Sequence, residues 1–242
     1  MTYEIGMVFL IAIISYLLGA ISFTRVVARI KSPENDIVDT EIQFVDADET
    51  MKVGHIGANV VGQTLGAKWG MLVGLMDISK VFLPSLACKL LFPELPYYTL
   101  LAGIAGMAGH NWPIYYRFRG GMGFSAAMGS LLAVDWLAVL VLPIAGTLLG
   151  MLVRNMVVAS LSWLWLLIPW MWWRASDPVY VLYAISLNLL FMLAMIPEIK
   201  KAIIYWREGR LDEYGESILR SNPMGRGMIK MAEKFNLSVR EK

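Results

Sequence analysis

The residues best suited to chemistry lie in one stretch between two apolar runs, AGHNWPIYYRFRGGMG from Ala108 to Gly123. This stretch holds His110, one of two histidines in the chain. Glycines that precede a helix let backbone N–H groups turn toward one point, and an arginine fork adds charge-assisted hydrogen bonds to a phosphate. The predicted phosphate-binding residues are Arg119, Gly120, Gly121 and Gly123. Three roles remain open for His110: substrate binding, proton transfer and helix capping.

A second polar pair interrupts the apolar run GLMDISKVFLP. Asp77 and Lys80 stand three residues apart there, so they share one face of a helix. Because a charge inside a membrane helix costs a few kcal/mol, such residues predict a functional site. Either the pair only locks the helix register, or Lys80 binds an anionic ligand while Asp77 keeps it protonated; the two roles are compatible.

The composition is that of an integral membrane protein. Hydrophobic residues make up 57% of the 242 residues and charged residues only 17%, whereas a soluble protein spreads charge over a solvated surface. The single cysteine, Cys88, excludes a disulfide or a cysteine metal site within one chain. The first apolar run, from Ile5 to Val27, is too long for a signal-peptide core and predicts a retained membrane helix.

Hydropathy predicts an all-α protein with seven transmembrane helices, at about residues 5–29, 67–91, 97–110, 121–134, 136–153, 156–173 and 178–197. The third and fourth hold about fourteen residues each, or roughly 21 Å of helix, which is less than the roughly 30 Å hydrocarbon core. Their ends must face protein or a water-filled cavity, because lipid cannot satisfy free backbone groups. The stretch 108–123 joins those two ends.

Four glycines recur at every fourth residue in the segment GQTLGAKWGMLVG, namely Gly62, Gly66, Gly70 and Gly74. On one continuous helix this spacing predicts a flat stripe, against which a neighbouring helix can pack closely. Such a stripe would let the helices close tightly around a site.

The distribution of basic residues predicts the orientation in the membrane. With the N-terminus outside, the inner loops and the tail receive most lysines and arginines, and the outer side receives only Lys89 and Arg174. We therefore expect a membrane domain at residues 1–199 and a cytoplasmic tail at 200–242. Residues 32–50 carry seven acids and no lysine or arginine, which predicts a solvated cytoplasmic insertion, with a short strand or a buried turn at 42–45.

The chain contains four motif-like segments in order: YLLGAISFTRVVARI, VGHIGANVVGQTLGAKWG, MDISK and AGHNWPIYYRFRGGMGFSAAMG. Their order resembles the bacterial acyl-phosphate:glycerol-3-phosphate acyltransferases of the PlsY family, over about residues 12–197. The strongest part is the family motif Gly-His-x-Phe-Pro-x-x-x-x-Phe-Lys-Gly-Gly-Lys-Gly. The residues that match it are Gly109, His110, Pro113, Phe118, Gly120, Gly121 and Gly123. Arg119 keeps the charge of the first lysine, and Met122 loses that of the second.

The other motifs keep fewer family residues. Where the family has Gly-Ser-x-Pro, residues 19–22 read Gly-Ala-Ile-Ser, so the hydroxyl is displaced to Ser22. In the second motif Val60 stands for an asparagine and Gln63 for an arginine. The resemblance implies His110 and Lys80 as catalytic residues. The substrate-binding or phosphate-binding residues that it adds to the glycine-rich turn are Ser22, Gly54, Gly57, Asn59 and Asp77.

The resemblance implies transfer of a fatty acyl group from acyl phosphate to the 1-hydroxyl of glycerol 3-phosphate, in phospholipid biosynthesis at the bacterial plasma (inner) membrane. It implies no metal and no other cofactor. The partners would be the two substrates and membrane lipid, without nucleic acid, and the oligomeric state stays open. One alternative is a non-catalytic homologue that binds lipid or phosphate or partners an active relative. Another is an unrelated channel or transporter, which the short helices would suit.

Overall fold

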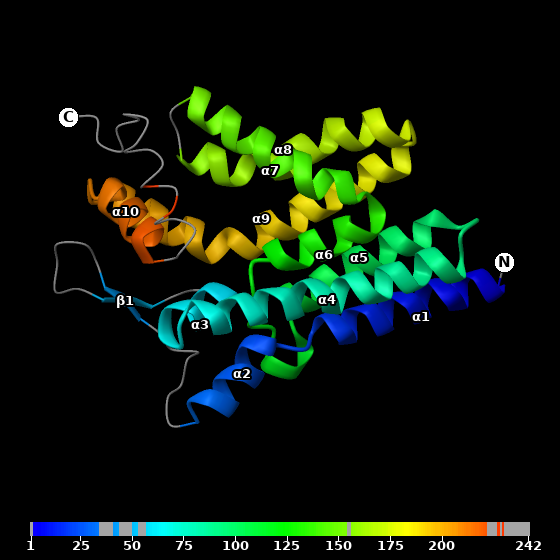
Figure 1. Cartoon of the computed structure of the whole chain (residues 1–242), viewed down its shortest axis with the longest axis horizontal. Coiled ribbons are helices and arrows are strands. Elements are labelled where there is room, and N and C mark those ends of the chain that lie inside the picture. The colour runs from blue at the N-terminus through cyan, green and yellow to red at the C-terminus, as the bar shows by residue number, and fades with distance from the viewer. Residues whose placement is uncertain are drawn as a thin grey trace. The chain divides into compact units, whose positions relative to one another are not determined.

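The computed structural model of the chain describes residues 2–33, 41–43, 50–52, 57–153, 156–221, 227 and 229. These residues form helices joined by short connections, together with one small hairpin (Figure 1). The helices are α1 (Thr2–Gly19), α2 (Phe23–Lys31), α3 (Ala58–Thr64), α4 (Ala67–Leu91), α5 (Pro96–Asn111), α6 (Phe124–Val134), α7 (Trp136–Leu152), α8 (Met156–Ala175), α9 (Pro178–Arg207) and α10 (Leu211–Ser221). A 3-10 turn at Ile114–Tyr116 lies between α5 and α6.

The helical class expected from hydropathy is therefore confirmed. Within the described residues, three helical stretches are long and apolar enough to cross a membrane, at Glu4–Lys31, Ala67–Leu91 and Pro178–Arg207. The two helices predicted to be short are short, with 16 residues in α5 and 11 in α6. The last apolar helix continues past its predicted end at residue 197, because α9 runs on to Arg207.

The first apolar run differs from the single helix expected at 5–29, because it breaks in two. Helix α1 ends at Gly19 and α2 begins at Phe23. A methyl group built on Gly19 would overlap the backbone of Gly106 in α5, so only glycine lets the end of α1 approach α5 so closely. The residues of the break, at 20–22, are buried or half-buried.

The predicted glycine stripe is wrong, because no continuous helix carries the four glycines. Helix α3 ends before Gly66, whose φ of 98° is in the left-handed region that favours glycine, and α4 starts at the next residue. The chain folds back here, and a methyl group on Gly70 would lie 2.6 Å from the Cα of Gly62. The glycines therefore make a tight helix–turn–helix. Val61 and Val73 from its two helices pack in one buried cluster with Val27 of α2.

The chain divides into two compact units, residues 1–22 with 75–194 and residues 23–74 with 195–242. In the first unit α5 packs against α1 and α6, and α7 packs against α8 (Figure 1). Buried polar groups join its helices, since the hydroxyls of Ser130 and Tyr183 lie 2.6 Å apart and the Asn188 side chain donates to the carbonyl of Leu164 at 2.9 Å. Such bonds stabilise helix pairs where no water competes.

In the second unit, β1 (Glu41–Gln43) pairs antiparallel with β2 (Thr50–Lys52), and β1 lies beside α10. Ile42 of the predicted strand thus lies in β1. The remainder of the acidic insertion, apart from residues 32 and 33, is outside the described residues. The tail helix α10 packs back on α9, where the hydroxyl of Tyr214 donates to Glu198 Oε2 at 3.1 Å.

One carboxylate joins three helix ends of the first unit. Asp135, between α6 and α7, accepts hydrogen bonds from the backbone N–H of Leu137, from Trp170 Nε1 at 2.9 Å and from Arg174 Nε at 3.1 Å. Burial raises the pKa of this carboxyl, but the bonds from Arg174 and Trp170 outweigh burial, so the pKa lies below its usual value. Asp135 therefore caps α7 and holds it to the end of α8.

Candidate active site

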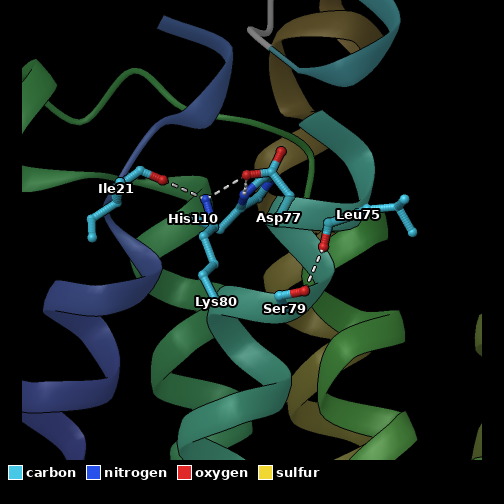
Figure 2. Close-up of polar contacts among 6 residues, drawn as sticks. All are labelled: Ile21, Leu75, Asp77, Ser79, Lys80 and His110. Atoms are coloured by element: carbon cyan, nitrogen blue, oxygen red, sulfur yellow. Dashed lines mark hydrogen bonds and ion pairs between the residues drawn. The ribbon is translucent and has the colours of Figure 1, made fainter. Parts of the chain in front are cut away.

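The centre of the site is a buried ion pair on α4. Lys80 Nζ lies 2.8 Å from Asp77 Oδ1, and the two side chains are 5% and 3% exposed (Figure 2). The spacing of three residues places them on adjacent turns of one helix face. A buried charge must be compensated, so each side chain offsets the burial cost of the other. The prediction that these two residues can pair is confirmed.

Lys80 also reaches the break in the first apolar run. Its Nζ donates to the carbonyl oxygen of Ile21 at 2.6 Å (Figure 2). This carbonyl follows the end of α1 at Gly19 and precedes the start of α2 at Phe23, where the regular helical bonds stop. A backbone carbonyl at such a break needs a donor from the protein. Lys80 therefore holds the segment that carries the predicted ligand Ser22.

His110, at the end of α5, approaches the same oxygen of Asp77 as Lys80 does. Its Nδ1 is 3.8 Å from Asp77 Oδ1, which is too long for a hydrogen bond but close enough for attraction to a protonated imidazole. The ring is packed against Gly121, where an added methyl group would overlap the imidazole. The N–H of Gly121 donates to the His110 carbonyl at 3.1 Å. One oxygen of Asp77 thus contacts the ammonium and lies near the imidazole.

The connection from α5 to α6 is tightly wound and partly strained. Arg117 and Phe118 have φ angles of 53° and 61°, in the left-handed region that non-glycine residues rarely adopt. Gly123 follows with a φ of 92° and stands at the N-cap of α6. A methyl group on Gly120 would overlap the His110 carbonyl. The glycines thus let this loop lie directly on the end of α5, while the Arg119 side chain is exposed.

Two residues that hold the end of α5 were not predicted from the sequence. The hydroxyl of Tyr16 in α1 donates to the carbonyl of Trp112 at 2.6 Å. The side-chain N–H of Asn111 donates to the carbonyl of Leu190 in α9 at 3.1 Å. Among the described residues, Asn111 Oδ1 has no hydrogen-bond partner and is buried. Its position beside His110 was the signal for Asn111, and Tyr16 is the first residue of the first motif-like segment, which assigned it no role.

The remaining predicted ligands fall into different parts of the structure. Ser22 follows Ile21 at the end of the first unit. Gly57 and Asn59 belong to the second unit, at the start of α3. Gly54 is outside the described residues. The structure therefore brings together Asp77, Lys80 and His110, with the glycine-rich loop on one side and the 20–22 segment on the other.

This arrangement suits an anionic substrate and a proton transfer. An ammonium and an imidazole lie near one carboxylate in a buried site, where each charge acts strongly. Within the described part of the chain, no group of three or more His, Cys, Asp or Glu side chains is placed to hold a metal ion.

The chain is similar to proteins of one family over most of its length. The family model described as glycerol-3-phosphate acyltransferase matches residues 9–205. The glycerol-3-phosphate acyltransferase of Aquifex aeolicus is 33% identical over 125 residues, which are 52% of this chain and 58% of that protein. The one of Halalkalibacterium halodurans is 33% identical over 156 residues, which are 64% and 66%. The match spans less than two thirds of either relative.

Other similarities are longer. Glycerol-3-phosphate acyltransferase 3 of Dehalococcoides mccartyi is 28% identical over 224 residues, or 86% of this chain and 98% of that protein. The crystal structure of PlsY (YgiH), an integral membrane glycerol 3-phosphate acyltransferase, in its glycerol 3-phosphate form has a TM-score of 0.65 and 25% identity, and the match covers 84% of this chain and 93% of that chain. The expected resemblance and integral membrane class are confirmed, and the chain belongs to the glycerol-3-phosphate acyltransferase family.

Proposed function

We propose that the protein transfers a fatty acyl group from acyl phosphate to the 1-hydroxyl of glycerol 3-phosphate. The observation that carries this proposal is the family match over residues 9–205, within which Asp77, Lys80 and His110 meet in one buried cluster. PlsY (YgiH), whose crystal structure includes a glycerol 3-phosphate form, is similar in fold over 84% of this chain. Both substrates are anions, which the cations of the cluster favour.

In the proposed reaction the substrate hydroxyl oxygen attacks the acyl carbonyl carbon. A carbon–oxygen ester bond forms, the bond from the acyl carbon to the phosphate oxygen breaks, and phosphate leaves with that electron pair. The hydroxyl proton ends on the phosphate, so atoms and charges balance without a metal or other cofactor. The enzyme's part is to orient two anions and to stabilise the charge that develops on the carbonyl oxygen.

We assign the residues of the site as follows. Lys80 and His110 are the proposed catalytic residues, because they flank Asp77 at the centre of the buried cluster. The loop before α6 supplies backbone N–H groups and a helix N-terminus for phosphate. The proposed binding residues are Arg119, Gly120, Gly121, Gly123, Gly54, Gly57, Asn59, Ser22 and Asp77.

The test is an assay of purified protein with acyl phosphate and glycerol 3-phosphate that follows phosphate release. We expect turnover that requires both substrates and yields the acylated glycerol phosphate. If the protein released no phosphate in an assay in which an active relative did, the proposed activity would be overturned. That result would favour a non-catalytic homologue that binds lipid or phosphate. The motif substitutions Val60, Gln63 and Met122 support that second candidate, since each missing charge-assisted bond costs about 1.5–3 kcal/mol.

We further propose seven crossings of the bacterial plasma (inner) membrane, with the N-terminus outside and the C-terminus in the cytoplasm. The support is the excess of basic residues on one side. Because Cys88 is buried, single cysteines can report the topology. Glu94→Cys, between α4 and α5, should react with an impermeant maleimide in intact cells, whereas Glu208→Cys should react only after permeabilisation. Both positions are exposed, and a reversed pattern would overturn the orientation.

A further inference from the structure

We propose that Tyr16 is a positioning residue for the reaction, because its hydroxyl fixes the end of α5 on α1 and with it the orientation of His110. The inference rests on the proposed acyltransferase function. Tyr16 lies outside the predicted site residues, and it contacts no reacting group. It acts through the backbone of Trp112, two residues after His110.

The hydrogen bond replaces one that the helix cannot make. Trp112 is the C-cap of α5, and its N–H bonds back to Ala108. The last carbonyls of a helix have no intrahelical donor. The Tyr16 hydroxyl supplies a donor at 2.6 Å from a helix that lies 96 residues earlier in the chain. Removing this hydroxyl would leave the carbonyl of Trp112 without that bond.

The backbones of α1 and α5 are in direct contact close to this hydrogen bond. A methyl group on Gly109 would overlap the carbonyl of Tyr16, and one on Gly19 would overlap the carbonyl of Gly106. Contacts at two levels along the pair fix the register of the helices, because neither backbone can slide without a clash. The Tyr16 hydroxyl then sets where the last turn of α5 stops.

A second helix restrains the same turn. Asn111 donates to the carbonyl of Leu190 in α9, and the N–H of Gly121 donates to the His110 carbonyl. His110 therefore sits on a turn held by α1, by α9 and by the loop before α6. Releasing one of these restraints should shift the imidazole relative to Asp77, at 3.8 Å, while the other two keep the fold. A misplacement of about 1 Å can cost up to about a hundredfold in rate.

The experiment compares Tyr16→Phe with Tyr180→Phe, which removes the same hydroxyl from a half-buried tyrosine outside the proposed site, at the start of α9. We expect Tyr16→Phe to lower kcat about five- to tenfold, the size of one lost hydrogen bond, with KM within about twofold. Tyr180→Phe should keep both constants. If Tyr16 had only a structural role, Tyr16→Phe would lower the thermal stability and the fraction of active protein. It would then not lower the kcat of the active protein at nearly unchanged KM.

A second readout does not depend on turnover. In a His55→Gln background His110 is the remaining histidine, so its rate of carbethoxylation by diethyl pyrocarbonate reports how tightly its turn is held. We expect Tyr16→Phe to raise that rate several-fold and Tyr180→Phe to leave it unchanged. Gly109→Ala, which pushes the Tyr16 backbone away while keeping its hydroxyl, should raise it as well.

The outcomes separate the two proposals. An inactive wild type would overturn the proposed function, while the carbethoxylation rates would still decide whether Tyr16 holds His110. Turnover in the wild type, with Tyr16→Phe equal to Tyr180→Phe in kcat and in His110 reactivity, would overturn the positioning role alone. If Tyr16→Phe raised His110 reactivity but kept kcat, the bond would hold the turn without serving the reaction, and the inference would again be wrong.

Discussion

The ammonium of Lys80 contacts groups of different kinds, among them a carboxylate on its own helix and a backbone carbonyl at the break in the first apolar run. A charge so placed is costly without its partners and stable with them. Because the same nitrogen contacts both, the electrostatics of the site and the position of the 20–22 segment depend on one side chain. A substitution at Lys80 therefore changes charge and geometry together.

Breaking this pair from either side should have the same effect on activity. We expect Lys80→Met and Asp77→Asn each to abolish turnover and each to lower the free energy of unfolding by about 3–5 kcal/mol, since each leaves one buried group uncompensated. The double variant should recover much of the stability and none of the activity. Thermal unfolding in detergent and phosphate release measure the two quantities, with exposed Glu94→Gln as the control. Unchanged phosphate release in folded Lys80→Met would remove Lys80 from the site.

Gly121 should tolerate no side chain. A methyl group there would overlap the imidazole of His110, so Gly121→Ala should displace the ring and lower kcat at least tenfold, which corresponds to about 1.4 kcal/mol. Gly6→Ala is the matched control, because nothing lies within 4 Å of the added methyl group in α1. Equal activity of the two variants would mean that the contact between Gly121 and His110 is not needed.

At the scale of elements, hydropathy predicted the short helices α5 and α6 because the apolar runs there end early. It could not predict the break between α1 and α2, because the apolar character continues through it. What ends α1 is tertiary: the backbone of Gly106 against Gly19 and the ammonium of Lys80 on Ile21. The glycines at every fourth residue led to the wrong prediction of one continuous helix for a related reason. Spacing alone does not reveal the left-handed φ of Gly66, where the chain turns.

The same limit applies to the site. Asp77, Lys80 and His110 could be identified from the sequence because charged or titratable side chains in apolar runs are rare. Tyr16 could not, because a tyrosine in an apolar helix is ordinary and its bond partner is a backbone carbonyl 96 residues away. Sequence patterns thus reveal the groups that carry charge better than those that hold the backbone in place.

The junction of α6, α7 and α8 should depend on pH through Asp135. Its folded-state pKa is lowered, so its stabilisation is complete above the ordinary value of 3.8 and is lost as pH falls through the folded pKa. Asp135→Asn keeps an oxygen that can cap α7 but loses the charge paired with Arg174, so it should lower stability by about 0.2–1 kcal/mol. Melting temperatures between pH 3 and pH 7 should converge for wild type and variant at the acid end, and a constant difference would contradict this role.

At the scale of the whole molecule, the proposed activity depends on how many cations surround the two anionic substrates. The family motifs carry charge where this chain has Gln63 and Met122. We therefore expect Gln63→Arg combined with Met122→Lys to raise kcat/KM, by about tenfold or more for each restored charge-assisted bond. Met122→Leu keeps the apolar character and serves as the control. No gain from the combined variant, in folded protein, would show that these losses do not limit the rate.

The break at the end of α1 also has a consequence for biogenesis. Two groups that contact the end of the first helix or the break after it, Lys80 on α4 and the carbonyl of Trp112 at the end of α5, are synthesised later, the latter 96 residues after Tyr16. At roughly 5–20 residues per second, about 5–20 seconds pass between the synthesis of Tyr16 and that of Trp112. The first helix is therefore synthesised before the groups that fix its end, and the earliest segment to be made is among the last to gain its tertiary contacts.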